Sequence, residues 1–243
     1  MASSSETGHT KNVDNFETLI TFCTGFGPAY NPSNPTLKIG NLTTFYQESQ
    51  AAIKLVNTTE KPFSSVEGDR QLIFKPLKPL ATKVVGALVA SGVPSTVIAD
   101  AETILRKIRG KRADNKEVPT PTGETPKNKH SVSQQSYDML IDHFDNLIEL
   151  LANQPNYNPN EDPLKVASLI DYLKKLNIIN SKVKEAYTPY SNAMIARDKK
   201  LYTPETGLVA ISGLVKNYVK SVFGASSPEY KQVKGLPFRT LLK

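Results

Sequence analysis

The sequence predicts an all-α protein, an elongated helical bundle from two internally duplicated sets of about four helices, each with a long proline-kinked helix. Two observations predict this fold. Apolar residues recur at spacings of three and four, the period of a helix and not the alternation of a strand. In addition, the phrase YNPSNPTLKI, which begins at Tyr30, returns as YNPNEDPLKV from Tyr157.

The repeat extends well beyond this phrase. Residues 30–75 align with residues 157–202 without a gap, and 10 of the 46 positions are identical. About three identities are expected from ordinary residue frequencies. Further upstream, VDNFETLITF aligns with IDHFDNLIEL. We therefore predict an internal duplication of residues 13–110 and 136–235.

In the first copy, the pattern predicts a helix over residues 13–24 that the YNPSNP phrase ends, because a residue before proline is disfavoured in helical geometry. Asn34 is suited to cap the next helix, with Pro35 at its first position. In the second copy we expect Asp162 and Pro163 to play these parts.

A long helix is predicted over residues 37–74, with a counterpart in the second copy. Each has an apolar stripe at helical spacing. The stripes are Leu42, Phe45, Ser49, Ala52, Val56, Thr59, Phe63 and Val66, and Leu169, Tyr172, Leu176, Ile179, Val183, Ala186, Tyr190 and Ala193. Pro62 and Pro189 interrupt both helices at matching places. Because proline removes a hydrogen bond inside a helix, paired bends are expected.

Shorter helices complete each copy. The first copy has helices over residues 77–90 and 95–109, the latter ended by Gly110. The second has helices over residues 205–223 and 227–234, each followed by glycine. Outside the copies we expect a disordered N-terminus (1–12), a flexible Pro/Thr-rich linker (111–135) and a basic C-terminal tail (236–243).

Charge and cysteine content restrict the classes of function. The net charge of +7 and pI near 9.3 favour anionic partners. The single cysteine, Cys23, excludes an internal disulfide and a clustered-cysteine zinc site, and its apolar neighbours predict a buried thiol. No secretion signal or membrane span is apparent, so we expect a cytoplasmic protein.

The sequence contains no recognisable catalytic motif, and we predict no enzyme, no cofactor and no metal site. His9 and His130 fall in segments predicted to be disordered, and His143 is expected on a helix surface. A carboxylate stripe could bind a cation, but a solvated face, or pairing with basic residues of another helix, is the favoured interpretation. The stripe is Asp138, Asp142, Asp145 and Glu149.

Basic residues gather where each copy ends. The candidate anion-contacting residues are Arg106, Lys107, Arg109, Lys111 and Arg112 in the first copy, and Lys231, Lys234 and Arg239 in the second. They would contact phosphates, and they would form one positive surface if the copies pack around a pseudo-two-fold axis. The alternative is that they complement the dipoles of the helix ends.

Two repeated basic pairs, Lys38/Lys165 and Arg70/Arg197, admit two interpretations. They could form two equivalent ligand sites. Pairing with acidic neighbours or loop carbonyls explains them more simply.

The segments YNPSNPTLKI, ARDKKLY and SVFGASSPEYKQVKGLPF resemble an uncharacterised family of helical, internally duplicated proteins from bacteria of the Bacteroidota type. The likeness covers most of the chain. It implies a cytoplasmic bacterial setting and carries no known activity.

We therefore expect a non-enzymatic interaction protein that binds an anionic macromolecule, RNA or a ribosome, through its basic helix ends. The alternative is a structural or scaffold protein that mediates contacts with another protein or with itself. No small-molecule substrate is evident from the sequence.

Overall fold

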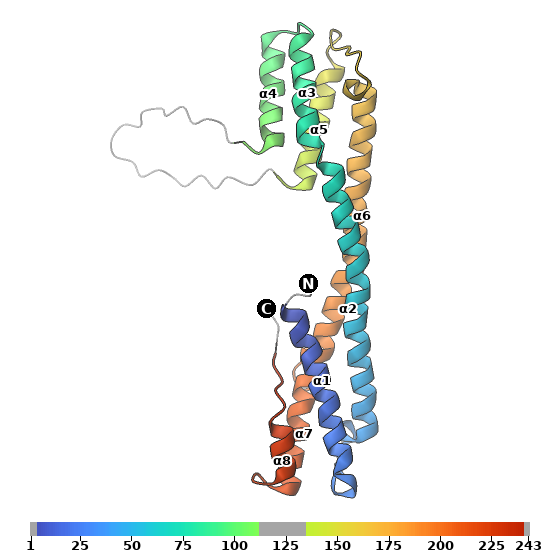
Figure 1. The fold of residues 1–243 in the computed structure, drawn as a ribbon, viewed down its shortest axis with the longest axis vertical. Coiled ribbons are helices and arrows are strands. Elements are labelled where there is room, and N and C mark those ends of the chain that lie inside the picture. The colour runs from blue at the N-terminus through green and yellow to red at the C-terminus, as the bar shows by residue number, and fades with distance from the viewer. Residues whose placement is uncertain (1–3, 112–134, 241–243) are drawn as a thin grey trace, which may run out of the picture. The chain divides into compact units, whose positions relative to one another are not determined.

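The computed structural model describes residues 4–111 and 135–240, with side chains from residue 8 onward. The described residues form helices and turns and no strand, which confirms the all-α prediction (Figure 1). The α-helices are α1 (Ser4–Gly25), α2 (Ile39–Phe74), α3 (Leu77–Ala90), α4 (Ser95–Arg109), α5 (Tyr137–Ala152), α6 (Val166–Tyr202), α7 (Leu208–Phe223) and α8 (Pro228–Lys234). The 3-10 turns are η1 (Gly27–Ala29), η2 (Pro35–Leu37) and η3 (Asp162–Leu164).

The chain divides into two compact units. The first unit is Met1–Phe63 with Ala186–Lys243, and the second is Ser64–Glu185. Neither unit coincides with one predicted sequence copy. Each unit combines the first half of one copy with the second half of the other, and both boundaries fall inside the long helices α2 and α6.

Each unit has its own hydrophobic core. In the first unit, Phe16 and Leu19 of α1 pack with Leu42 of α2 and Val215 of α7. The predicted thiol burial is confirmed, since Cys23 is 1% exposed in this core. In the second unit, the core contains Leu88, Ile108, Phe144, Leu147 and Leu169.

The predicted stripes of both long helices are confirmed, because every residue in them is buried or half-buried. Both helices continue through their internal prolines, Pro62 and Pro189. The predicted bends stay predictions.

The N-terminal prediction was wrong, because α1 begins at Ser4 and not at residue 13. His9 is 2% exposed and Asn12 is 3% exposed. The ring of His9 shares a 2.6 Å hydrogen bond with the hydroxyl of Tyr202, and Asn12 donates to the same hydroxyl at 3.2 Å. These polar side chains are therefore part of the packed first unit. His130 and nearly all of the predicted linker lie outside the described residues.

Helix starts were predicted with mixed success. The side chain of Asn34 accepts a hydrogen bond from the backbone of Thr36, as expected, although it caps η2 and not α2 directly. Asp162 does not cap its turn; it lies inside η3, and its carboxylate contacts Lys165. Helix α7 begins at Leu208 and not at residue 205, because Glu205 has a left-handed backbone (φ 67°).

Candidate anion-binding surface

Helix α4 ends beside the first half of α3 in the second unit (Figure 1). Five basic residues lie on these two segments. We call this cluster the basic end. Its members are Lys78, Arg106, Lys107, Arg109 and Lys111. Four of them were predicted from the sequence, and Lys78 was not.

The end of α4 has a defined backbone geometry. The N–H of Gly110 donates to the carbonyl of Lys107, and the N–H of Lys111 donates to the carbonyl of Arg106, each at 3.1 Å. This pair of bonds is a Schellman motif, which requires the left-handed conformation found at Gly110 (φ 74°). A Cβ atom at position 110 would lie 2.6 Å from the side chain of Gln135. The predicted helix stop at Gly110 is thus confirmed.

Side-chain hydrogen bonds hold the basic end together. The guanidinium of Arg109 donates to the hydroxyl of Thr82 through Nε at 3.2 Å and Nη2 at 2.7 Å. The Nζ of Lys78 donates to Oε1 of Gln135 at 2.9 Å, and Nε2 of Gln135 donates to the carbonyl of Lys107 at 2.7 Å. These bonds link α3, the end of α4 and the segment before α5.

No residue of the basic end is in an ion pair with a described residue, although Glu102 lies one turn before Arg106 on α4. Ion pairs join other cations to carboxylates, namely Arg70, Lys165, Lys174, Lys184, Arg197 and Lys200. None of these belongs to the basic end. Residues 71–99, which include α3, contain three lysines and no Asp or Glu. Lys78, Lys107, Arg109 and Lys111 are exposed, and Arg106 is half-buried. The cluster therefore presents positive charge to solvent that no close ion pair neutralises.

The remaining predicted candidates are not part of this cluster. Arg112 lies outside the described residues. Lys231, Lys234 and Arg239 are exposed but belong to the first unit. The backbone of Arg239 is held by Asn12, which donates to its carbonyl at 2.8 Å and accepts from its N–H at 3.1 Å. The eight candidates are thus divided between the units, and a single positive surface stays a prediction.

The repeated arginines are paired within the protein. The guanidinium of Arg70 lies 3.9 Å from the ring centre of Tyr137 and donates to Asn180 at 3.3 Å. Arg197 is 4% exposed and contacts the carboxylate of Asp198 at 2.8 Å. This pairing supports the simpler of the two interpretations for both arginines. Lys165 likewise pairs with Asp162, at 2.6 Å, whereas Lys38 is exposed.

The carboxylate stripe of α5 serves mainly as a polar surface. Asp138 accepts hydrogen bonds from Lys184 at 2.7 Å and Asn180 at 2.8 Å, and the Lys184 contact holds the pKa of Asp138 below its usual value. Asp142, Asp145 and Glu149 are exposed. No three His, Cys, Asp or Glu side chains gather as metal ligands in the part of the chain that the structure describes.

His143 is buried, contrary to the sequence prediction. It is 5% exposed because it shares the inner face of α5 with Leu140 and Leu147. Burial, followed by the charge of nearby Lys107, lowers the pKa of His143. Burial thus favours the neutral form of the imidazole.

Comparisons with known proteins identify no relative of this chain. No protein-family model, curated protein or solved structure matches this chain. The family resemblance given above therefore stays a prediction. Among the described helices, none has both the length and the apolar character required to cross a bilayer.

Proposed function

We propose that this protein is a non-enzymatic interaction protein that binds an anionic macromolecule, with RNA or a ribosome as the partner, through the basic end of its second unit. One observation carries the proposal. None of the five cations of the basic end is in an ion pair with a described residue, and hydrogen bonds link the segments that carry them. Their charge is available to an external anion.

The chemistry of the cluster favours a phosphate backbone. Arginine and lysine contact phosphate oxygens, and each contact releases counterions from the nucleic acid. We therefore expect binding that depends strongly on salt and little on base sequence.

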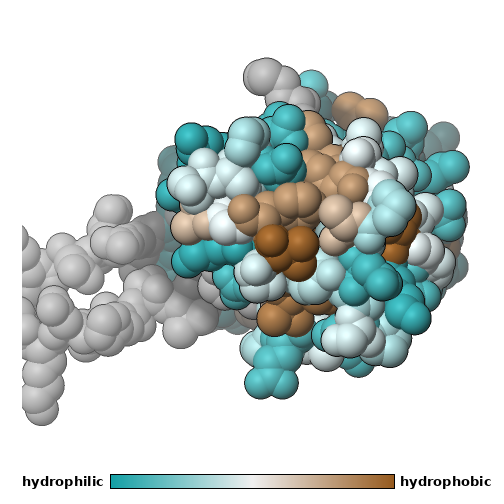
Figure 2. Space-filling view, turned by 90° about the horizontal axis from the view of Figure 1, so that it is seen from below, coloured by the Kyte–Doolittle hydropathy of each residue, from teal (hydrophilic) through white to brown (hydrophobic). Residues whose placement is uncertain are grey.

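A second candidate is a scaffold function in contact with another protein or a second copy. Figure 2 views the first unit from the end where α1 and α7 finish, and shows apolar side chains at that surface. At this end Val222 is 45% exposed, and the ring centroids of Phe26 and Phe223 lie 5.1 Å apart. A defined oligomer in light scattering, with no retention on heparin, would favour this function.

Retention on a heparin column tests the first proposal. The test variant carries Lys78→Gln, Lys107→Gln and Arg109→Gln. The control carries Lys38→Gln, Lys54→Gln and Lys61→Gln, which are exposed positions of the first unit with the same change in net charge. We expect the test variant to elute at lower salt than the control. Equal elution of both variants would show that net charge, and not the basic end, causes retention.

A further inference from the structure

The sequence Tyr-Asn-Pro begins a turn at residues 30–32 of the first unit and at residues 157–159 of the second. We call each of these a YNP turn, and the two have the same internal geometry. The hydroxyl of Tyr30 donates to the carbonyl of Leu37 at 2.8 Å, and that of Tyr157 donates to the carbonyl of Leu164 at 2.8 Å. In each case the 3-10 turn that follows packs on a helix of the same unit, η2 on α7 and η3 on α3.

The two turns differ in what covers them. In the first unit, the ring of Tyr218 from α7 packs edge-to-face on Tyr30, with centroids 5.2 Å apart. Its hydroxyl also accepts a hydrogen bond from the backbone N–H of Asn31 at 3.1 Å. An aromatic side chain thus closes the space between the turn and the helix.

In the second unit, α3 has no aromatic residue at the corresponding place. Alignment of α3 with α7 from their first residues makes buried positions coincide, namely Leu77 with Leu208, Val84 with Val215 and Leu88 with Val219. In the same alignment, Ala87 of α3 is the position equivalent to Tyr218 of α7. The second unit therefore has a methyl group where the first has a phenol ring.

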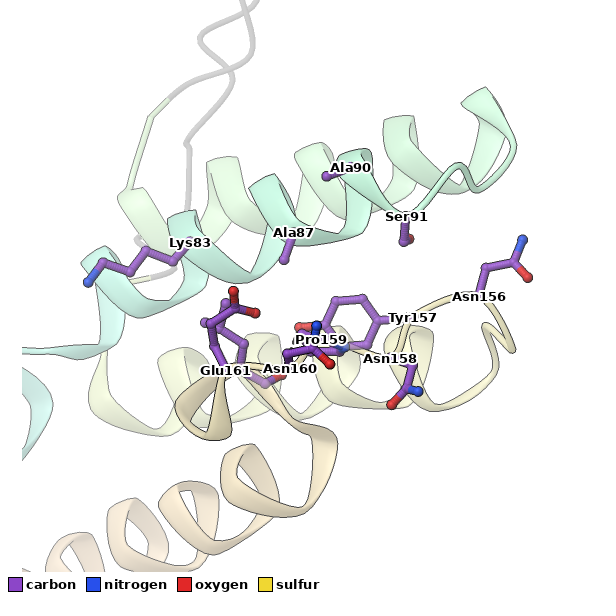
Figure 3. A pocket seen from close by; sticks show the side chains of 11 residues that line it. Lys83, Ala87, Ala90, Ser91, Asn156, Tyr157, Asn158, Pro159, Asn160 and Glu161 are labelled. Carbon is purple, nitrogen blue, oxygen red and sulfur yellow. Dashed lines mark hydrogen bonds between the residues drawn. The ribbon is translucent and has the colours of Figure 1, made fainter.

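A pocket occupies this position. It has a volume of about 560 Å³ and lies between α3 and the turn, with Lys83, Ala87 and Ser91 on one side and Tyr157, Pro159 and Glu161 on the other (Figure 3). Two apolar residues of the turn are more exposed in the second unit, whereas Tyr157 is as buried as Tyr30, at 7%. Leu37 and Pro32 are buried in the first unit, whereas their counterparts, Leu164 and Pro159, are half-buried.

We propose that this pocket binds a ligand carrying a phenol ring, which takes the place that Tyr218 holds in the other unit. The ring would pack against Tyr157 and Ala87. Its oxygen would accept from the N–H of Asn158, the counterpart of Asn31, which now donates to the carbonyl of Asn156 only two residues away. The pocket volume lies within the range typical of small-ligand sites.

Two charged side chains at the pocket suit the polar groups of such a ligand. Lys83 and Glu161 both line it and are exposed. Neither is in an ion pair within the described residues. No residue of the basic end lines the pocket, so this inference is independent of the proposed function.

NMR titration of the full-length protein with p-cresol, the side-chain analogue of tyrosine, tests the inference. For a ligand of this size we expect saturable shifts with a dissociation constant on the order of 1 mM. The variant Ala87→Tyr should fill the pocket and weaken binding by at least about tenfold. The control Val89→Tyr, an exposed position on the same helix, should bind p-cresol as the wild type does.

Further variants and ligands complete the test. If Ala87→Tyr does not fold, as judged by circular dichroism, Ala90→Trp narrows the same pocket from an exposed position. Unchanged p-cresol affinity in the folded pocket variant, or no saturable binding to the wild type, would overturn the inference.

N-acetyltyrosinamide serves as a second ligand. Tighter binding than p-cresol would identify a tyrosine of a peptide as the source of the ring, and weaker binding a free phenol.

Discussion

The hydroxyl of Tyr30 donates a 2.8 Å hydrogen bond to the carbonyl of Leu37, seven residues further along the chain. This bond closes the turn between α1 and α2. Tyr157 and Leu164 close the turn between α5 and α6 in the same way. The repeated phrase therefore builds the same turn before each long helix.

Removal of this bond should destabilise the protein. In Tyr30→Phe the buried carbonyl of Leu37 loses its partner, and we expect the free energy of unfolding to fall by about 1 to 2 kcal/mol. Urea unfolding followed by circular dichroism measures the change. The control is Tyr187→Phe, because Tyr187 is 47% exposed and should tolerate the loss of its hydroxyl. Equal stability of the two variants would contradict the role of the bond.

A second prediction concerns Asn180, which is 4% exposed and connects Arg70 to Asp138. Asn180→Ala leaves both partners incompletely hydrogen-bonded, and we expect a loss of about 2 kcal/mol in unfolding free energy. Asn177→Ala, at an exposed position of the same helix, should change stability by less than about 0.5 kcal/mol. Chemical denaturation of both variants measures the difference, and a loss of similar size in both would argue against the network.

Two glycines of the second unit should respond to alanine with opposite signs. Gly110 has φ 74° and faces Gln135, so Gly110→Ala should destabilise by about 1 to 2 kcal/mol. Gly86 lies inside α3, and a Cβ atom added there would meet nothing within 4 Å, so Gly86→Ala should stabilise by about 0.5 to 1 kcal/mol. Thermal unfolding measures both changes. A stabilising Gly110→Ala would contradict the described end of α4.

Stability should decrease at alkaline pH. Burial raises the pKa of Cys23 from 9.0 to about 12. The folded thiol therefore keeps a proton that the unfolded chain loses, so its contribution is fully present below pH 9.0 and is lost as the pH rises toward about 12. The loss is at most about 1.4 kcal/mol per pH unit for this group. Burial acts in the same direction on Tyr157 and Tyr172, and raises the pKa of each to about 12.

Urea unfolding at several pH values from about 8 to 11 measures this dependence. The variant Cys23→Ala lacks the thiol and should lose stability less steeply than the wild type. The same slope in both proteins would contradict the pKa assigned to Cys23.

Much of the secondary structure could be predicted because local residues determine it. Helices α3 and α4 have the predicted bounds, since prolines and glycines mark their ends. The start of α1 could not be predicted in this way. His9 and Asn12 are polar, and their burial depends on Tyr202, which lies 190 or more residues away in sequence.

The candidate site was predicted in part for a related reason. Arg106, Lys107, Arg109 and Lys111 are close in sequence, so their charge is visible as a run. Lys78 joins them only through the packing of α3 on α4 and through Gln135. The division into units also depends on tertiary contacts, because helical periodicity shows which face is buried but not which helix covers it.

The most direct test of the proposed function is the salt dependence of RNA affinity. Fluorescence anisotropy with a labelled single-stranded RNA would be measured across a series of KCl concentrations. Each lost phosphate contact reduces the slope of log affinity against log salt by about 0.7, so the variant with Lys78→Gln, Lys107→Gln and Arg109→Gln should lose about 2 from the wild-type slope. The control variant with Lys38→Gln, Lys54→Gln and Lys61→Gln should keep the wild-type slope. A wild-type affinity that does not vary with salt, or a basic-end variant with the wild-type slope, would contradict the proposal.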